Sequence, residues 1–355
     1  MRYKFSDLYY DDTKNAKKLK SSEYKNIGKY IIVDQGKSLI AGYTDNEDGL
    51  YTDVPVIIFG DHTRNIKYIN SPFFLGADGT KVLKSSLKNA NYKYLYYLLK
   101  NASIPDTGYN RHYKWLKELM FEYHSQEQQN QIVNILDKLD LTISKYREEL
   151  LLLDELVKAR FVEMFGDPVS NSKDLPVQKM NNVAPICQYD GSFEESVWLL
   201  NLDMVESQTG RIINYNIVSK DEIGGSVCTF DENNVLYSKL RPYLNKVVVP
   251  DGKGYATSEL VPLRPDPKII NRIYLAYLLR SNEFVEMIKE KVAGAKMPRV
   301  SMSDFREFNV PVPPLELQNQ FASFVKEIDK SRSRIQKSLE ASQELFDSLM
   351  QEYFG

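Results

Sequence analysis

The sequence predicts an α+β protein in which two α/β globules are separated by two long helices that form an antiparallel coiled coil. Residues 126–166 align without a gap on residues 315–355, and 12 of the 41 positions are identical. Both copies have the apolar spacing of a long helix, whereas the segments outside them mix short β-like runs with turn signals. We therefore expect globules at 1–125 and 167–314 and long helices at 126–166 and 315–355.

The first predicted globule has a strand-like run at Val54–Phe59 between the turn signals Asp48-Gly49 and Asp78-Gly79. Near its end, residues 94–100 (YLYYLLK) match residues 274–280 (YLAYLLR) of the second globule at five of seven positions. The two globules are thus expected to be built alike. Basic residues outnumber acidic ones in 1–125, but the whole chain has 46 basic and 48 acidic residues, a net charge of −2. Net charge alone therefore gives no argument for nucleic-acid binding.

The repeated segments are predicted to be continuous helices. Neither contains proline, and each has its only glycine at its very end, where helices prefer it. Apolar side chains recur in steps of three and four from Ile132 onward, and in the second copy Arg332 and Ser342 interrupt this seam. At 1.5 Å per residue each helix would be roughly 50–60 Å long. Two unrelated amphipathic helices, each packed on its own globule, are the alternative, but the shared register and ends favour a duplicated pair that packs together.

The second predicted globule has strand-like runs at Val235–Ser238, Lys246–Pro250 and Phe308–Val312. The only cysteines, Cys187 and Cys228, form no Cys-x-x-Cys pair, which excludes a disulfide framework or a thiolate zinc site. We expect both to be core residues. No run of about 18 apolar residues and no secretory signal is present, so a cytoplasmic protein without a membrane anchor is expected.

Catalytic motifs are missing from the sequence. Gly36-Lys37-Ser38 resembles the end of a phosphate-binding loop, but position 31 is isoleucine where that loop needs glycine. The sequence contains no Asn-Pro-Pro-Tyr, His-Glu-x-x-His, Gly-x-Ser-x-Gly or Gly-x-Gly-x-x-Gly, and only three histidines. We therefore expect no catalysis, no metal and no cofactor on this chain.

The sequence resembles the specificity (S) subunit of type I restriction-modification systems. The resemblance covers essentially the whole chain, although the first helix lacks the Pro-Pro lead that precedes the second. The matching stretches are 56–64 (VIIFGDHTR), 108–117 (GYNRHYKWLK), 236–246 (LYSKLRPYLNK) and 310–318 (VPVPPLELQ).

This resemblance implies that the two globules are target recognition domains, each of which reads one half of a bipartite sequence in double-stranded DNA. The two long conserved helices would set the spacer and dock two methylation (M) subunits. Restriction (R) subunits would join the complex, and S-adenosylmethionine, ATP and Mg would bind to these partners. The chain itself would be a non-catalytic recognition subunit.

Candidate DNA-binding residues are cations that lie at turns or beside aromatic residues. Arginine and lysine suit phosphate oxygens and guanine edges, although an ordinary solvated basic surface would look the same. The candidates are Arg64, Lys67, Arg111, His112, Lys114, Lys117, Lys239, Arg241, Lys246, Lys296 and Arg299.

Amide side chains open both helices at equivalent positions. They could hydrogen-bond a partner subunit or the adjacent globule, or simply solvate the helix start, and we take them as candidate subunit-interface residues. They are Gln129, Asn130, Gln131, Gln318, Asn319 and Gln320. Two other functions stay open at this point, namely a protein-binding coiled-coil scaffold and a fused DNA methyltransferase or nuclease.

Overall fold

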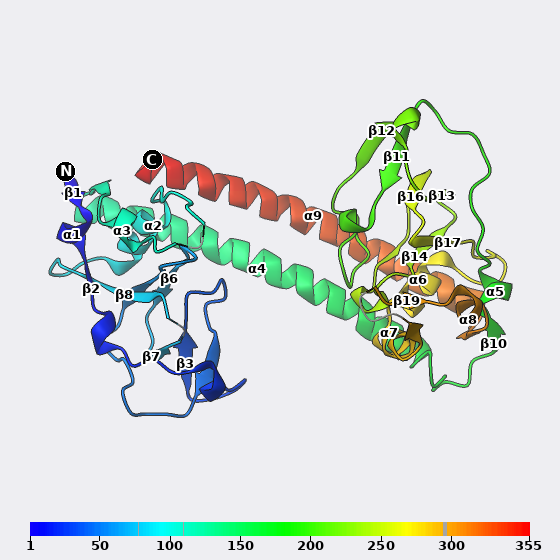
Figure 1. Cartoon of the computed structure of the whole chain (residues 1–355), viewed down its shortest axis with the longest axis horizontal. Helices are drawn as coiled ribbons and strands as arrows, with labels where there is room; N and C mark the ends of the chain where they lie inside the picture. The colour runs from blue at the N-terminus through cyan, green and yellow to red at the C-terminus, as the bar shows by residue number, and fades with distance from the viewer. Residues whose placement is uncertain (77, 109, 294–296) are drawn as a thin grey trace. The chain divides into compact units, whose positions relative to one another are not determined.

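The computed structural model describes residues 1–76, 78–108, 110–293 and 297–355. The chain divides into two compact units (Figure 1). Unit 1 consists of Met1–Arg147 and Lys337–Gly355, and unit 2 consists of Glu148–Gln336. We call residues 1–125 lobe 1 and residues 167–314 lobe 2. Both units cut across the two long helices, so the domain boundaries drawn from the sequence stay a prediction.

The two long helices are α4 (Gln126–Phe165) and α9 (Leu315–Phe354). Unit 1 contains the start of α4 and the end of α9, and unit 2 contains the opposite ends, so the helices run antiparallel (Figure 1). At 40 residues, each is about 60 Å long. Gly166 ends α4 with φ of +71°, and its N–H donates to Val162 O at 2.8 Å. The predicted fold class is confirmed.

In the described part of lobe 1, the strands form two sheets and a short two-stranded ribbon. The first sheet is antiparallel and has the order β2-β8-β5-β6. The second sheet has the order β4-β3-β7, and its strands β3 and β7 are parallel. The ribbon consists of β1 and β9, which are antiparallel. The strands are β1 (Arg2–Lys4), β2 (Tyr9–Asp11), β3 (Tyr30–Val33), β4 (Gly42–Thr44), β5 (Val56–Gly60), β6 (Ile66–Ile69), β7 (Phe73–Leu75), β8 (Thr80–Ser85) and β9 (Met120–Glu122). The helices are α1 (Phe5–Leu8), α2 (Tyr92–Lys100) and α3 (Tyr113–Leu116).

Lobe 2 contains sheets of order β12-β11-β16-β13 and β15-β14-β17, and the ribbons β10-β20 and β18-β19. The strands are β10 (Val177–Lys179), β11 (Ser196–Leu200), β12 (Asn216–Ser219), β13 (Val227–Phe230), β14 (Val235–Ser238), β15 (Val247–Val248), β16 (Gly254–Thr257), β17 (Leu260–Leu263), β18 (Val292–Ala293), β19 (Arg299–Val300) and β20 (Asn309–Pro311). The helices are α5 (Met180–Val183), α6 (Arg272–Arg280), α7 (Asn282–Lys289) and α8 (Met302–Arg306).

The two lobes share a strand plan, as the sequence echo predicts. In lobe 1, β3 pairs antiparallel with β4 and parallel with β7; in lobe 2, β11 pairs in the same way with β12 and β16. Likewise, β5 lies between β6 and β8 as β14 lies between β15 and β17. The echoed helix, α2 or α6, follows the last of these strands in each lobe.

The echoed helix joins each lobe to the long helices through one apolar core. In unit 1, Tyr94 and Tyr97 of α2 share a core with Leu136 of α4 and with Phe346 and Met350 of α9. In unit 2, α6 shares a core with both long helices in the same way, through Tyr274, Phe161 and Phe321. The long helices therefore pack as part of a three-helix arrangement in each unit.

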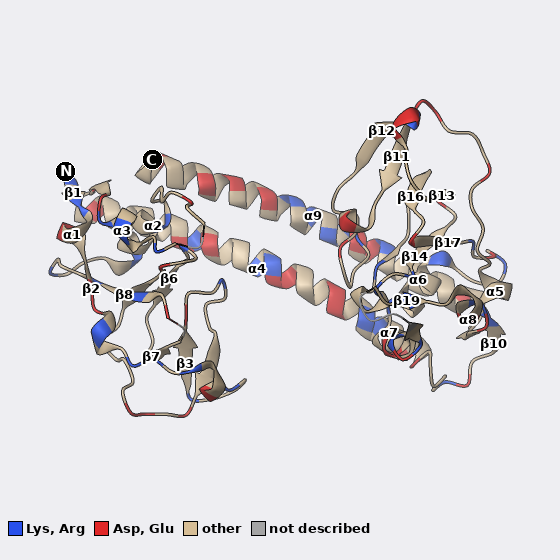
Figure 2. Ribbon diagram, viewed as in Figure 1, with Lys and Arg blue, Asp and Glu red and all other residues tan. Residues whose placement is uncertain are grey.

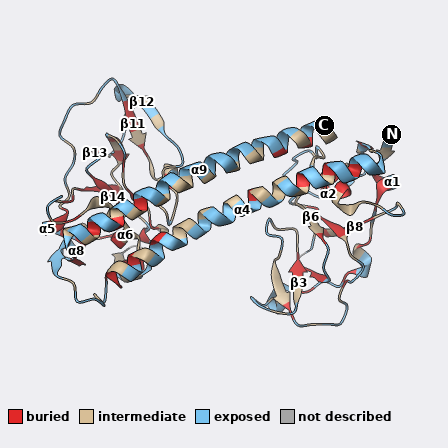
Figure 3. Ribbon diagram, turned by 180° about the vertical axis from the view of Figure 1, so that it is seen from behind, coloured by how far each residue is buried: buried red, intermediate tan, exposed pale blue. Residues whose placement is uncertain are grey.

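The helical seam is apolar near the ends of α4 and polar in between. The buried α4 residues fall at 129–143 and 157–165, and none lies between Ile143 and Val157 (Figure 3). In that stretch the Arg147 guanidinium donates to Gln343 Oε1 at 3.1 Å, and Arg332 pairs with Asp154 at 2.6 Å. The predicted heptad register is thus present, but apolar burial stops in the middle of the seam.

The expectation for the cysteines is half right. Cys228 is buried in β13, but Cys187 is exposed, which corrects the prediction that both lie in the core. Cys187 follows an isolated β-bridge at Ile186 and lies in a surface connection, so its side chain gains no apolar burial.

Candidate nucleic-acid interface

In lobe 1 the β5–β6 turn packs against the connection that precedes α3. The Asp61 carboxylate accepts the Tyr113 backbone N–H at 2.7 Å, and the His62 ring lies 3.2 Å from Asn110 O. Arg64 adopts a left-handed conformation with φ of 60° and pairs with Asp106 at 2.6 Å. The turn thus brings two sequence-distant groups of predicted DNA-binding residues together.

Three of the predicted cations of this region are exposed. They are Arg111, Lys114 and Lys117. The Lys114 ammonium lies 4.9 Å from the centre of the Trp115 ring, and that of Lys117 lies 5.0 Å from the Tyr113 ring. The aromatic residues thus support the lysine stems while the charges face solvent.

Two other predicted residues of lobe 1 are buried. Lys67 donates to Asp34 O at 2.7 Å, and burial lowers the pKa of its ammonium. The His112 ring is fully buried, and its Nδ1 lies 2.9 Å from Asp61 O. In this conformation both side chains are committed to holding the turn together, so direct DNA contact by either would require the turn to open.

In lobe 2 the predicted cations gather where β14 ends. Backbone hydrogen bonds join the segment after β14 to β19 and the residue before it. The Arg241 N–H donates to Pro298 O, and the Val300 N–H donates to Lys239 O. The Arg299 guanidinium pairs with Glu259 at 2.8 Å, and this pairing lowers the pKa of the Glu259 carboxyl. Arg241 is exposed and left-handed, with φ of 48°.

Arg64 and Arg241 lie at equivalent places of the two lobes. Arg64 lies between β5 and β6, and Arg241 lies between β14 and β15. Left-handed backbone is uncommon for residues other than glycine and asparagine, and its recurrence at functional sites is well documented. Both lobes therefore present an arginine on a strained turn at the same point of their plan.

Two members of the predicted set remain. The Lys246 ammonium donates to Leu202 O at 2.6 Å, and burial lowers its pKa. Lys296 lies outside the described residues. Direct DNA contact stays a prediction for the whole candidate set.

The amides that open the two long helices bind their own lobes. Gln129 and Gln318 are buried. Gln318 donates to Ile269 O and Pro313 O and accepts the Asn271 N–H at 2.7 Å. Gln129 donates to His124 O at 2.9 Å. These contacts agree with the adjacent-globule alternative for these two glutamines.

The neighbouring asparagines repeat one contact in both units. The Asn91 amide donates to Asn130 Oδ1 at 3.2 Å, and the equivalent Asn271 amide donates to Asn319 Oδ1 at 2.8 Å. Asn91 and Asn271 are also the N-caps of α2 and α6. Gln131 and Gln320 are exposed and remain candidates for a subunit interface.

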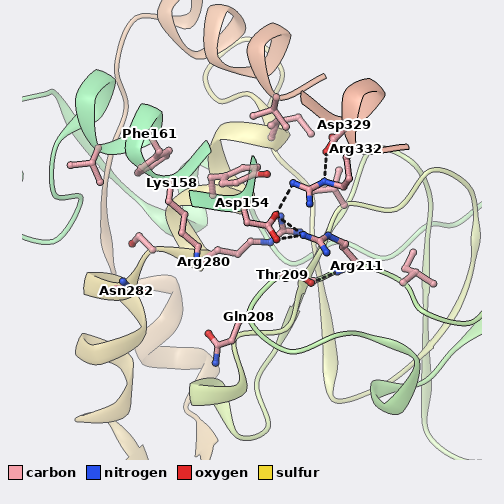
Figure 4. A pocket seen from close by; sticks show the side chains of 18 of the residues that line it. Asp154, Lys158, Phe161, Gln208, Thr209, Arg211, Arg280, Asn282, Asp329 and Arg332 are labelled. Carbon is pink, nitrogen blue, oxygen red and sulfur yellow. Dashed lines mark hydrogen bonds and ion pairs between the residues drawn. The ribbon is translucent and has the colours of Figure 1, made fainter. Parts of the chain in front are cut away.

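Sequence reasoning missed an ion network in unit 2. The Asp154 carboxylate of α4 lies between the guanidinium groups of Arg211, from lobe 2, and Arg332, from α9 (Figure 4). The signal was present, because Arg332 interrupts the apolar seam. Its partners could not be assigned, since Arg211 lies in a connection far away in the sequence.

Acidic and basic residues are interleaved along both long helices (Figure 2). Among the described residues, no cluster of three or more His, Cys, Asp or Glu is placed to hold a metal ion. Likewise, no helix in the described part of the chain is both long and apolar enough to cross a membrane.

Comparison with known proteins agrees with this architecture. Residues 203–343 match the family described as type I restriction modification DNA specificity domain. The chain is 26% identical over 135 residues to the type I restriction enzyme EcoDI specificity subunit of Escherichia coli, covering 38% of this chain and 30% of that protein. It is 20% identical over 363 residues to the EcoR124I/EcoR124II specificity subunit of the same species, covering 92% of this chain and 86% of that protein.

A solved structure shows the same fold. The type I restriction-modification S subunit of M. genitalium is 16% identical, with a TM-score of 0.64, over all of this chain and 96% of that one. Two long helices with mixed α/β lobes thus define a specificity-subunit fold. The chain is thus similar to type I restriction-modification specificity (S) subunits in its second half by sequence and over its whole length by fold. Its match to the EcoDI subunit spans 30% of the length of that protein.

Proposed function

We propose that this chain reads a two-part sequence in double-stranded DNA, with one part read by each lobe. The observation that carries the proposal is the repeated device, in which two lobes of one strand plan are joined in the same way to a duplicated helix. A pair of long helices that links two lobes suits a target with two separated half-sites, because DNA half-sites repeat at about 34–36 Å per helical turn.

The proposed contact surface in each lobe is the cation cluster at the equivalent turn. In lobe 1 it comprises Arg64, Arg111, Lys114 and Lys117; in lobe 2 it comprises Lys239, Arg241 and Arg299. Arginines on such turns suit both phosphates and guanine edges. Glu259 would hold the Arg299 fork in place, and Asp106 would hold that of Arg64.

The long helices are proposed to set the distance between the half-sites and to dock two M subunits. Exposed apolar side chains on α4 support docking, because Leu151, Leu152 and Leu156 are 67%, 58% and 48% accessible in the stretch of the helix where apolar burial stops. Such side chains are typical of a surface that another helix covers. R subunits would join this assembly, and S-adenosylmethionine, ATP and Mg would be held by the partners.

Exchange of one lobe tests the proposal. In the complex with M subunits, residues 167–314 are replaced by the corresponding lobe of another S subunit, and the methylated sequence is determined across a genome. We expect one half of the target to change and the other half to persist. An unchanged target would contradict the proposal and favour the alternative of a protein-binding scaffold.

Point variants locate the contact surface within the same complex. Arg111→Ala and Arg241→Ala should weaken DNA binding by about 1–3 kcal/mol if they read bases, or lower the salt dependence by about one unit of slope if they hold phosphate. Lys14→Ala, at an exposed position outside both clusters, is the control. Salt-dependent DNA titration makes the measurement, and equal affinity of all four proteins would exclude these turns as the interface.

A further inference from the structure

A cavity of about 480 Å³ lies within unit 2, where lobe 2 meets the two long helices (Figure 4). Its walls come from Asp154, Lys158 and Phe161 of α4, from α6, from the 208–212 connection and from α9. Sites for small organic molecules fall in the range of about 300–1,000 Å³. The cavity is therefore large enough for such a ligand.

One wall of the cavity contains an arginine, Arg332, with one nitrogen that has no hydrogen-bond partner among the described residues. Arg332 pairs with Asp154 at 2.6 Å, and its Nε lies 3.7 Å from Asp329. Its Nη1 is buried and has no hydrogen-bond partner among the residues that the structure describes. A buried donor left in this way is costly, and an acceptor from a ligand would relieve that cost.

A second arginine on the wall, Arg280, is held by a backbone carbonyl and by the Tyr277 ring, whose centre lies 5.2 Å from the guanidinium carbon. The Arg280 Nε and Nη2 donate to Val247 O at 3.0 and 2.6 Å, and burial lowers the pKa of this guanidinium. Among the carboxylates of the lining, Asp154 is shared between Arg211 and Arg332, and the Asp329 side chain is 61% accessible. With Glu283, the lining has three carboxylates against the four cations Lys158, Arg211, Arg280 and Arg332, so its formal charge is positive.

The equivalent positions of unit 1 show that the fold does not need these polar groups. At the repeat offset, Arg332 corresponds to Ile143, which is buried, and Asp154 corresponds to Gln343. Arg280 corresponds to Lys100, whose ammonium lies 5.0 Å from the Phe346 ring and 5.5 Å from the Tyr96 ring. The same three-helix packing is therefore completed in unit 1 with an apolar residue in place of Arg332.

We propose that the unit 2 cavity binds a small organic phosphate with a planar aromatic body, of the size of a nucleoside monophosphate. Its phosphate pairs with Arg332 Nη1 and Arg280, since guanidinium forks match phosphate oxygens. Its planar body lies against Ile273 and Val249, which belong to the apolar part of the lining. The proposal does not depend on DNA recognition, and a ligand there would bridge lobe 2 and both helices.

Calorimetric titration of the full-length chain tests this with AMP and UMP as probes, alongside inorganic phosphate and adenosine. We expect at least one nucleotide to bind with a submillimolar dissociation constant, and phosphate and adenosine each to bind at least tenfold more weakly. A short DNA duplex added in excess should leave nucleotide binding unchanged. Absence of binding by both nucleotides, or full competition by the duplex, overturns the proposal.

Arg332→Ile provides the decisive variant, because it places in unit 2 the residue type that unit 1 already tolerates at Ile143. We expect this chain to fold and to lose at least tenfold in nucleotide affinity. Arg147→Ile, which removes the seam contact to Gln343 in unit 1, is the matched control and should bind like the parent. If Arg332→Ile binds nucleotide as well as the parent does, the arginine serves only helix register and the proposal is wrong.

Discussion

The lobe–helix joints of unit 1 and unit 2 share their aromatic contacts and differ in polarity. Tyr94 packs on Phe354 with ring centres 5.5 Å apart, and the equivalent Tyr274 packs on Phe165 at 4.7 Å. In contrast, Ile143 in unit 1 corresponds to Arg332 in unit 2. The duplicated lobe–helix contact thus keeps the packing that buries large rings, and it differs at a position that is isoleucine in unit 1 and arginine in unit 2.

The buried glutamines of the two joints differ in how fully they are satisfied. Gln318 uses both its amide and its carbonyl oxygen, whereas the Gln129 Oε1 is buried with no hydrogen-bond partner in the described part of the structure. The same residue type therefore contributes differently to the stability of the two units, because its contribution depends on the hydrogen-bond partners that each lobe supplies.

The largest expected effects come from truncating the buried side chain near the start of each long helix. Phe321 is fully buried, with ring centres 5.5 Å from Phe161 and Phe165 and 5.3 Å from Tyr277. Phe321→Ala should cost about 3–5 kcal/mol, and Ile132→Ala, its unit 1 equivalent, about 2–5 kcal/mol.

Chemical denaturation gives the size of each loss, and hydrogen exchange locates it. Phe321→Ala should increase amide exchange in unit 2, and Ile132→Ala should increase it in unit 1. Uniform acceleration in both units by either variant would show that the joints do not act separately.

Substitution of the two buried glutamines, Gln318 and Gln129, should have effects of intermediate size that differ between the two units. Gln318→Leu should lower the free energy of unfolding by about 1–3 kcal/mol, because it leaves a buried N–H and two carbonyls without a partner. Gln129→Leu should cost less than about 1 kcal/mol, because it removes one hydrogen bond together with an unsatisfied oxygen. Urea denaturation of both variants measures the difference, and equal losses would contradict the contacts seen at Gln318.

The smallest expected effect is a pH dependence in unit 2. Burial raises the pKa of the Asp329 carboxyl, outweighing the attraction of Arg332. A raised folded-state pKa contributes stability below the unfolded value, and that contribution is lost as pH rises through the folded pKa. Since the side chain is 61% accessible, water screens the effect to a few tenths of a kcal/mol.

Asp329→Asn should therefore be slightly more stable than the parent at neutral pH, and the difference should vanish in acid. Asp140→Asn, the equivalent change in unit 1, is the matched control. Thermal denaturation between pH 3 and 7 measures both, and a parent that gains stability relative to Asp329→Asn as pH rises would reverse the sign.

The sequence predicts the long helices more accurately than it predicts the residues of the candidate site. The gapless repeat predicts the ends of α4 and α9 to within one residue. The strand-like runs at 235–238 and 308–312 correspond to β14 and β20. Local periodicity and turn residues suffice for such elements. The burial of Lys67 and His112 could not be predicted, because their partners, Asp34 O and Asp61 O, are 33 and 51 residues away.

By itself, the sequence determined the duplication, the antiparallel helix pair and the presence of a cationic turn in each lobe, because spacing and residue type are local properties of the chain. Only the tertiary structure decided which cations face solvent, which amides hold the lobes, and that Arg332 lines a cavity with Asp154 and Arg211. Those outcomes depend on side chains that meet from distant segments, where burial and pairing set the free energy of each charge.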